Sequence, residues 1–527
     1  MGKWSSVRTA LAAVALCMLA ACGGGGSSGG RPITPTTPPV TPPPAAAYPD
    51  IPATDADAVR FLAQATFGAS QADITRLRQI GYRRWLDEQL DPARNAPTLI
   101  LPHLQQVVAN GVLREDLRQQ DRRNAWLWKA ATSPDQLRMR MAFALSEIFV
   151  VSDREVANAN ATLYRIADYQ DMLARGAFGS YRDLLEQVTL HPAMGYFLSH
   201  AGNAKADPAR NTTPDENYGR EVMQLFSLGL AKRNRDFTLV LDASGNAIPT
   251  YDEQVVSAMA RVFTGWTYEG QSDAQFGRRN DTSFAPLQCH PRFHDDQAKR
   301  IFDGITVPAG TNCAASLDTA LDALAAHQNV APFISRQLIQ RFVTSNPSAA
   351  YVGRISAVWL QSGGNLGQVL RAILLDDEAR VRPQGDAFGK AREPLIRLTT
   401  LWRAFDARYV PPASGEIRFR FANAGDLTEP LSQDSQRAPS VFNFFDPDYR
   451  LATGTGNTGL FAPEFQILTE ATYQGMLNQH DAMVWNYVGT APVANTPAPV
   501  LGVSRLVALA EAGNHAGRVD QLDTLLF

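Results

Sequence analysis

Signals that begin and end α-helices recur along the chain from Thr54 onward, and no other feature limits the fold so strongly. In TDADAVRFLAQATFG, Thr54 suits the N-cap position, acidic residues follow at the positive end of the helix, and Gly68 suits the position just after its end. Ser70 then caps the run SQADITRLRQIGY, with Asp73 at the third helical position. Two consecutive helices are therefore predicted at the start of this region.

A longer helix is predicted in SPDQLRMRMAFALSEIFVVS, which begins with Ser133 as the cap and has proline at the first helical position. Within it Leu137, Met141, Leu145 and Phe149 recur every fourth residue. Side chains at this spacing lie on one face of a helix, so these four are expected to face the core.

The same signals predict helices along most of the remaining chain: Asn158–Arg175, Tyr181–Leu190, Asp252–Thr264, Ala315–His327, Pro332–Thr344, Ala349–Gln361, Leu366–Leu375, Glu393–Phe405, Pro463–Gln479 and Val503–Ala512. Strand patterns are few, in Phe237–Leu241, which could be one arm of a hairpin, and in Glu416–Ala422. The predicted fold is mainly α: a large multi-helix globular body over residues 51–527, with at most a few short strands. Long irregular loops are expected around residues 265–312 and 410–460, and loops of that length are usually functional or disordered.

Overall composition agrees with a globular body. Of 527 residues, 45% are apolar and 19% are charged, which allows a sizeable core. The net charge of −3 gives no electrostatic reason to expect nucleic acid as a partner.

The amino terminus has the pattern of an export signal. Lys3 and Arg8 precede an apolar run, Thr9–Ala20, that is too short to span a bilayer. The following Leu-Ala-Ala-Cys sequence resembles a bacterial lipobox, although an ordinary secretory signal cleaved nearby is the alternative. The resemblance implies that residues 1–21 are a lipoprotein signal peptide and that Cys22 carries the lipid attachment. Gly23, and not aspartate, follows, so the expected location is the cell envelope, anchored to the outer membrane.

Residues 22–50 are expected to be a lipid-anchored linker. This segment starts with a flexible Gly/Ser-rich stretch and continues through the stiffer, Pro-rich PITPTTPPVTPPP. Such a composition cannot bury a core, so the linker would hold the folded body away from the membrane.

Two cysteines, Cys289 and Cys313, remain in the body after export. In an oxidising compartment they are expected to form a disulfide, which would stabilise the fold by roughly 3 kcal/mol.

The stretch TTPDENYGREVMQLFSLGL, residues 212–230, has the densest group of polar residues. Thr213 and Glu216 predict a capping box, Glu216 and Arg220 an exposed ion pair, and Gly229 the helix end. Glu221 lies at the edge of the apolar face, where a carboxylate needs a partner. An arginine from another helix is the expected partner, and a catalytic or ligand-binding role is the alternative.

Two other segments are candidate sites. The segment QCHPRFHDDQAK, 288–299, has metal-type ligands without the spacing of a standard site, and His294 with Asp295 could instead be an acid–base pair or a hydrogen-bonded loop anchor. The segment RAPSVFNFFDPDY, 437–449, either packs on the helical core or forms an aromatic wall for a sugar or a partner. The GTGNTG at 454–459 lacks the βαβ unit of a dinucleotide site, so neither a nucleotide nor another cofactor is expected.

Seven segments, in one order along the chain, resemble the bacterial family catalogued as domain of unknown function 1800: RFLAQATFGAS with GYRRWLDEQL, ENYGREVMQLFSLGL, ARVFTGWT, FHDDQAK, APFISRQLIQRFV and PSVFNFFDPDY. The resemblance covers roughly residues 55–472. It implies an exported bacterial protein, often encoded beside a second exported family, with no established reaction. The shared polar positions of the family correspond here to Glu216, Asn217, Arg220, Glu221, Arg261, Trp266, His294, Asp295 and Lys299.

Many members of the family carry Trp-His-x-His-Phe where this chain has Ser146-Glu147-Ile148-Phe149. A metal role that depends on those histidines is therefore not expected in this protein.

Two functions agree with these features. The favoured hypothesis is a non-catalytic binding or assembly factor that works with another exported protein. The alternative is an envelope hydrolase acting on polysaccharide or peptidoglycan. Its catalytic candidates are Glu221, His294 and Asp295, and its substrate-binding candidates are Asn217, Arg220, Arg261, Trp266 and Lys299. In that case the residues must converge in one cleft.

Overall fold

The computed structural model describes residues 48–154, 162–381, 387–411, 415–419, 431–451, 459–487 and 498–526. The expected signal peptide, Cys22, nearly all of the linker and most of GTGNTG lie outside these residues. Among the described residues, no helix combines the length and the apolar character that crossing a bilayer requires.

Helices make up most of the described chain: α2 (Asp55–Ala65), α3 (Gln71–Leu90), α4 (Leu101–Ala109), α5 (Gln119–Thr132), α6 (Gln136–Ser146), α7 (Leu163–Gly176), α8 (Tyr181–Leu190), α9 (Pro192–Phe197), α10 (Asn217–Gln224), α11 (Glu253–Val262), α12 (Cys313–Ala326), α13 (Val330–Phe342), α14 (Ala349–Ser362), α15 (Leu366–Leu375), α16 (Asp377–Arg380), α17 (Pro394–Ala404), α18 (Glu470–Tyr487), α19 (Ser504–Glu511) and α20 (His515–Leu526). The strands are short and pair antiparallel in twos: β1 (Trp266–Thr267) with β2 (Gln288–Cys289), β3 (Lys299–Arg300) with β4 (Thr306–Val307), and β5 (Arg408–Val410) with β6 (Ala498–Val500). The prediction of a mainly α fold with a few short strands is confirmed.

Local capping explains the helix starts that were predicted correctly. Thr54 and Ser70 each form a capping box, in which the hydroxyl accepts from the third helical amide and the aspartate there accepts from the cap amide. Leu137, Met141 and Leu145 on α6 are buried as expected.

Two predicted helix starts are wrong, because other hydrogen bonds hold the backbone there. Ser133 does not cap α6, since its amide donates to the Lys129 carbonyl and ends α5. Thr213 does not cap α10, which begins at Asn217. The residues before it are held as a loop, because the Asp215 amide donates to the side chain of Asn203 at 2.8 Å.

The two strand predictions have different outcomes. Phe237–Leu241 lies in a projecting ribbon of residues 230–250, in which Leu239 pairs with Arg233 and Leu241 with Ala247; we call this ribbon the arm. The predicted strand Glu416–Ala422 is not formed over its described part, 416–419.

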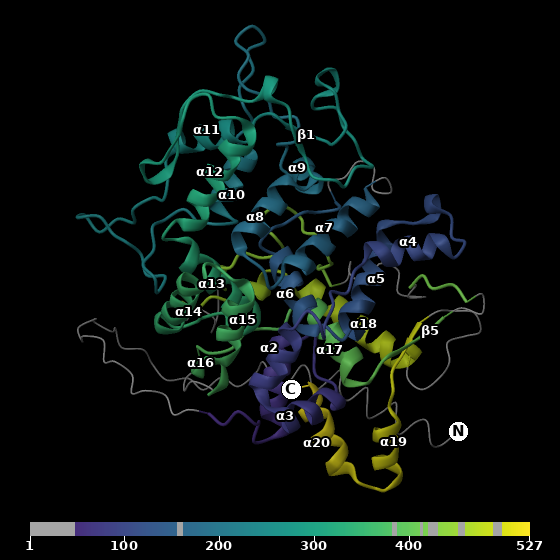
Figure 1. Cartoon of the computed structure of the whole chain (residues 1–527). Helices are drawn as coiled ribbons and strands as arrows, with labels where there is room; N and C mark the ends of the chain where they lie inside the picture. The colour runs from purple at the N-terminus through teal and green to yellow at the C-terminus, as the bar shows by residue number, and fades with distance from the viewer. Residues whose placement is uncertain are drawn as a thin grey trace.

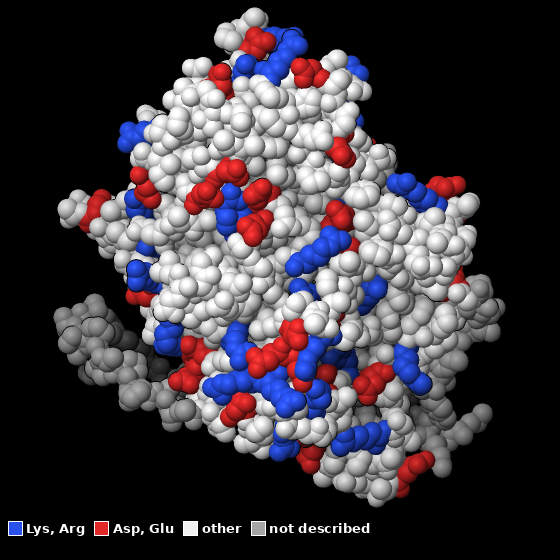
Figure 2. Space-filling model, viewed as in Figure 1, with Lys and Arg blue, Asp and Glu red and all other residues white. Residues whose placement is uncertain are grey.

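Figure 1 shows α9 to α12 at one end of the body and α2, α3, α19 and α20 at the other, with α6, α7, α13 and α15 between them. One continuous apolar core runs through these helices, and a small second cluster packs Val150 against Ala438, Phe444 and Phe445. On the face in Figure 2, basic and acidic side chains lie among one another, and neither sign gathers into a patch of its own.

Candidate functional site

Glu221 is buried on α10 without the predicted arginine from another helix. Its Oε2 atom has no hydrogen-bond partner among the described residues. Burial raises the pKa of Glu221, and only Arg220 on the same helix opposes this shift. Arg220 itself pairs with Glu216, as predicted, and also with Glu253 at 3.1 Å.

Several of the other candidates lie near the C-terminal end of α11 and the loop that leads to β3. Arg261 donates two hydrogen bonds to Asp295, at 2.8 and 2.9 Å. His294 is buried and its ring nitrogens lie 2.8 Å from the Thr264 carbonyl and 3.1 Å from the Ser316 hydroxyl. With both nitrogens engaged, His294 is placed as an anchor of this loop.

Lys299 and Trp266 are part of the same buried region, and Asn217 is not. The Lys299 ammonium is fully buried, and neither it nor the Trp266 indole nitrogen has a partner among the described residues. Asn217 is exposed at the first position of α10. Arg261 bonds to Asp295, whereas Glu221 Oε2 has no hydrogen-bond partner among the described residues, so no described hydrogen bond joins Glu221 to this group.

Cys289 and Cys313 are at disulfide distance, with Cα atoms 6.0 Å apart. The pair joins β2 to the first residue of α12. Within the part of the chain that the structure describes, no three His, Cys, Asp or Glu side chains gather so that they could hold a metal ion.

A cleft of about 680 Å³ lies elsewhere, and its residues form the best candidate site. One wall is formed by residues 224–237, which run from the end of α10 into the arm, and a second by the face of α13 (333–341). The third wall is residues 439–448, which we call the aromatic loop. Glu147 and Ile148, just after α6, and Gln466 complete the lining. The volume is within the range of about 300–1,000 Å³ that ligand pockets have.

Glu147 is a buried acid in the lining of this cleft. Burial raises the pKa of Glu147 to about 8, although Arg341 opposes the shift, so burial favours the protonated form of this side chain. Behind it lies Glu393, whose pKa burial would raise but whose neighbours Lys390 and Arg140 hold it below its usual range. The Gln433 amide donates to Glu393 at 2.7 Å and to Glu147 at 3.3 Å, so it joins the two carboxyl groups.

Arginines stack on phenylalanines along the cleft. The guanidinium groups of Arg233 and Arg336 lie 4.2 and 4.7 Å from the centre of the Phe237 ring, and that of Arg341 lies 4.6 Å from the centre of the Phe445 ring. Such cation–π contacts hold the planar groups in place. The arginines are therefore fixed before any ligand binds.

Two cleft residues have a left-handed backbone. Phe237 has a φ of 70° and Asn443 a φ of 68°. This conformation is unusual for any residue but glycine, and it costs most for a bulky side chain such as phenylalanine. Backbone strain of this kind is concentrated at binding and catalytic sites.

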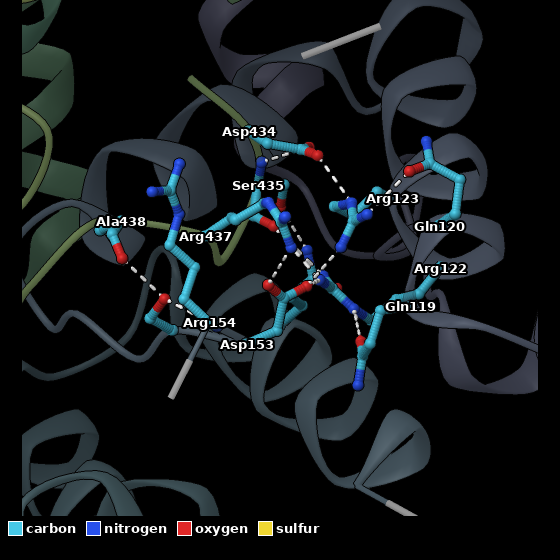
Figure 3. Close-up of polar contacts among 12 residues, drawn as sticks. Gln119, Gln120, Arg122, Arg123, Asp153, Arg154, Asp434, Ser435, Arg437 and Ala438 are labelled. Atoms are coloured by element: carbon cyan, nitrogen blue, oxygen red, sulfur yellow. Dashed lines mark hydrogen bonds and ion pairs between the residues drawn. The ribbon is translucent and has the colours of Figure 1, made fainter. Parts of the chain in front are cut away.

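A buried ionic network fixes the chain just before the aromatic loop (Figure 3). Asp153 accepts from Arg122 at 2.9 Å, Arg123 at 2.7 Å and Arg437 at 3.0 Å. Arg123 also pairs with Asp434 at 2.7 Å. Because Arg122 and Arg123 belong to α5, the network ties residues 434–437 to the helical body and so positions one wall of the cleft.

Sequence reasoning found only part of this site. The sequence predicts that the aromatic loop either packs on the core or forms a wall for a sugar or a partner. Phe445 is buried, as packing on the core requires, and Phe442 is 58% exposed in the lining of the cleft. In the sequence, Glu147 stands out only as part of a segment that lacks the family's histidines. A glutamate directly after an apolar helical run was the signal that could have identified it.

Comparison with known proteins gives one match. The family model described as Protein of unknown function (DUF1800) matches residues 60–526, beyond residue 472 where the resemblance read from the sequence ended. No curated protein and no solved structure matches the chain.

Proposed function

The chain belongs to the family described as Protein of unknown function (DUF1800), so we propose its function from the cleft itself. We propose that it is a lipid-anchored protein of the bacterial cell envelope. In this proposal its cleft binds a segment of another exported protein. The observation that carries the proposal is the combination of preset arginines and phenylalanines in a cleft of about 680 Å³. Arginine and aromatic side chains are enriched in protein–protein interfaces and contribute most of their binding energy.

Exposed apolar side chains at the cleft support a protein partner. Leu230 is 61% exposed and Phe442 is 58% exposed, and both line the cleft. Leu239 and Leu241 continue this apolar character along the arm, at 41% and 51% exposure. A partner that covers them would remove apolar surface from water, which favours association.

The expected tether agrees with this role. A lipid on Cys22 would hold the protein in the envelope, and the Gly/Ser- and Pro-rich linker would give the body reach to meet a partner.

The test is site-specific photo-crosslinking of the full chain in its native envelope. A photoreactive residue at Phe442 probes the cleft, and the same residue at Leu360, which is 50% exposed on α14, is the matched control. We expect one discrete crosslinked protein from position 442 and none from position 360. Equal products from both positions, or none from position 442, would contradict the proposal.

An envelope hydrolase is the second candidate, and Glu147 is the observation that favours it. An acid that keeps its proton at neutral pH can protonate a leaving group. If the protein cleaves peptidoglycan or polysaccharide, the purified chain should release soluble fragments, and Glu147→Gln should abolish that release. Unchanged fragment release from Glu147→Gln would remove Glu147 as the acid.

A further inference from the structure

We infer that the segment bound in the cleft is an extended peptide with an acidic side chain, which pairs with Arg233 while the peptide backbone bonds to the Asn443 amide. The inference rests on the function proposed above, and it names the chemistry that the partner must present.

Arg233 is the arginine of the cleft that forms no ion pair among the described residues. Burial lowers the pKa of Arg233, and Asp448, which pairs with Arg336, opposes this shift. Its guanidinium stacks on Phe237 and donates to the Phe237 carbonyl at 3.2 Å. Arg336, by contrast, pairs with Asp448 at 2.5 Å, and Arg341 lies 3.5 Å from Glu147. A half-buried guanidinium without an ion pair of its own gains more from a carboxylate than a fully exposed one does.

The charges of the lining also favour an acidic ligand. The lining holds three arginines, at 233, 336 and 341, beside Asp446, Asp448 and Glu147, and burial favours the protonated form of Glu147. With Glu147 protonated, the arginines outnumber the charged carboxylates by one. A negatively charged segment is attracted to this lining, and a positively charged one is repelled.

Asn443 supplies a second and independent feature. It is 7% exposed, it lines the cleft, and neither its Nδ2 nor its Oδ1 atom has a partner among the described residues. Buried polar groups are normally hydrogen-bonded, and leaving them unpaired is costly. A side-chain amide offers one donor and one acceptor side by side, which matches the N–H and C=O groups of a peptide backbone.

Two of the aromatic rings in the cleft, Phe237 and Phe445, are better suited to holding arginines than to stacking on a sugar. A sugar ring would stack on an open aromatic face. Phe237 is contacted by two guanidinium groups, and Phe445 is buried beneath a third. These rings are already used to hold arginines, and arginines recognise carboxylates.

The experiment compares three labelled peptides that differ at one central residue, which is aspartate, asparagine or lysine between flanking alanine and leucine residues. Binding to the full chain in detergent micelles is measured by fluorescence polarisation at low ionic strength. We expect the aspartate peptide to bind about tenfold to a hundredfold more tightly than the asparagine peptide, as a charge-assisted hydrogen bond allows. The lysine peptide should bind most weakly.

Two variants separate the inference from a general loss of charge. Arg233→Gln should make the aspartate and asparagine peptides bind equally. Arg235→Gln is the matched control, because Arg235 is exposed two residues further along the arm, and it should leave the preference unchanged. Asn443→Ala should weaken the binding of the aspartate and asparagine peptides alike, since Asn443 would contact the peptide backbone, which is the same in both.

Either of two results would overturn the inference: an aspartate preference that survives Arg233→Gln, or equal or absent binding of the aspartate and asparagine peptides. Tighter binding of an oligogalacturonate probe than of any peptide would instead assign the cleft to an acidic sugar. In each of these outcomes, crosslinking from Phe442 to a partner would still support the proposed function. The inference and the proposed function can therefore fail separately.

Discussion

Replacement of Asp153 by alanine should destabilise the protein strongly and loosen one wall of the cleft. Asp153 is buried and accepts hydrogen bonds from Arg122, Arg123 and Arg437. Arg122 is fully buried and Arg123 is 6% exposed. Without the carboxylate, these two arginines would lose their shared counter-ion inside the body.

Removal of one partner from a buried ion pair costs about 3–5 kcal/mol, because the remaining charge stays buried. Asp434 still faces Arg123, so we expect the lower end of that range, about 3 kcal/mol. Asp153→Asn keeps the shape and one acceptor oxygen and should cost less. The matched control is Asp55→Ala, which removes an exposed pair with Arg78 and should cost no more than about 1 kcal/mol.

The pH dependence follows from the same charges. Burial alone would raise the pKa of Asp153, but Arg122 and Arg123 outweigh it, and the folded pKa lies below 3.8. The stabilisation by Asp153 is therefore fully present above pH 3.8 and is lost as the pH falls through the lower folded value. Asp153→Asn should remove this part of the acid sensitivity.

The assay is urea unfolding combined with hydrogen exchange of the amides in α5 and in residues 431–438. Hydrogen exchange is needed because a body of this size can open locally before it unfolds. Asp153→Ala should accelerate exchange in both segments. If it unfolds within about 1 kcal/mol of Asp55→Ala, with unchanged exchange, the network does not hold the wall and the reasoning is refuted.

Four further predictions concern other parts of the chain. Alanine at both Cys289 and Cys313 should lower the free energy of unfolding by about 3 kcal/mol, and intact mass without reductant should show the wild-type cysteines oxidised. Burial raises the pKa of Glu147 from 4.5 to about 8, so the folded state holds a proton that the unfolded chain loses; stability should fall as the pH rises between these values, and urea unfolding of Glu147→Gln should show a smaller fall. Gly219→Val should cost about 1–3 kcal/mol in urea unfolding, because even a Cβ atom there would lie 3.1 Å from the backbone of α11. Cys22→Ala should move the protein from the membrane pellet to the supernatant after cell fractionation, and continued pelleting would argue against the lipid anchor.

Local sequence was sufficient to predict the fold class and most helices. Thr54 and Ser70 begin helices because each is satisfied by an aspartate three residues away, and a capping box depends on nothing more distant. Leu137, Met141 and Leu145 are buried because their spacing places them on one face of a helix. Prediction was wrong at Ser133, whose amide donates to the Lys129 carbonyl, and at Thr213, near which the Asp215 amide donates to the Asn203 side chain.

The candidate site could not be predicted in the same way. Polar residues cluster around Glu221 and His294 in the sequence, yet His294 bonds to Thr264 and Ser316, and Glu221 Oε2 has no hydrogen-bond partner among the described residues. The cleft is built instead from Glu147, Arg233 and Asn443, which stand far apart along the chain. No local pattern joins them, since their proximity depends on how α6, α10 and α13 pack and on the ionic network that fixes the aromatic loop. Sequence alone therefore determined the helices and the family, whereas burial, the raised pKa of Glu147 and the surroundings of Arg233 and Asn443 arise only when distant segments are brought together.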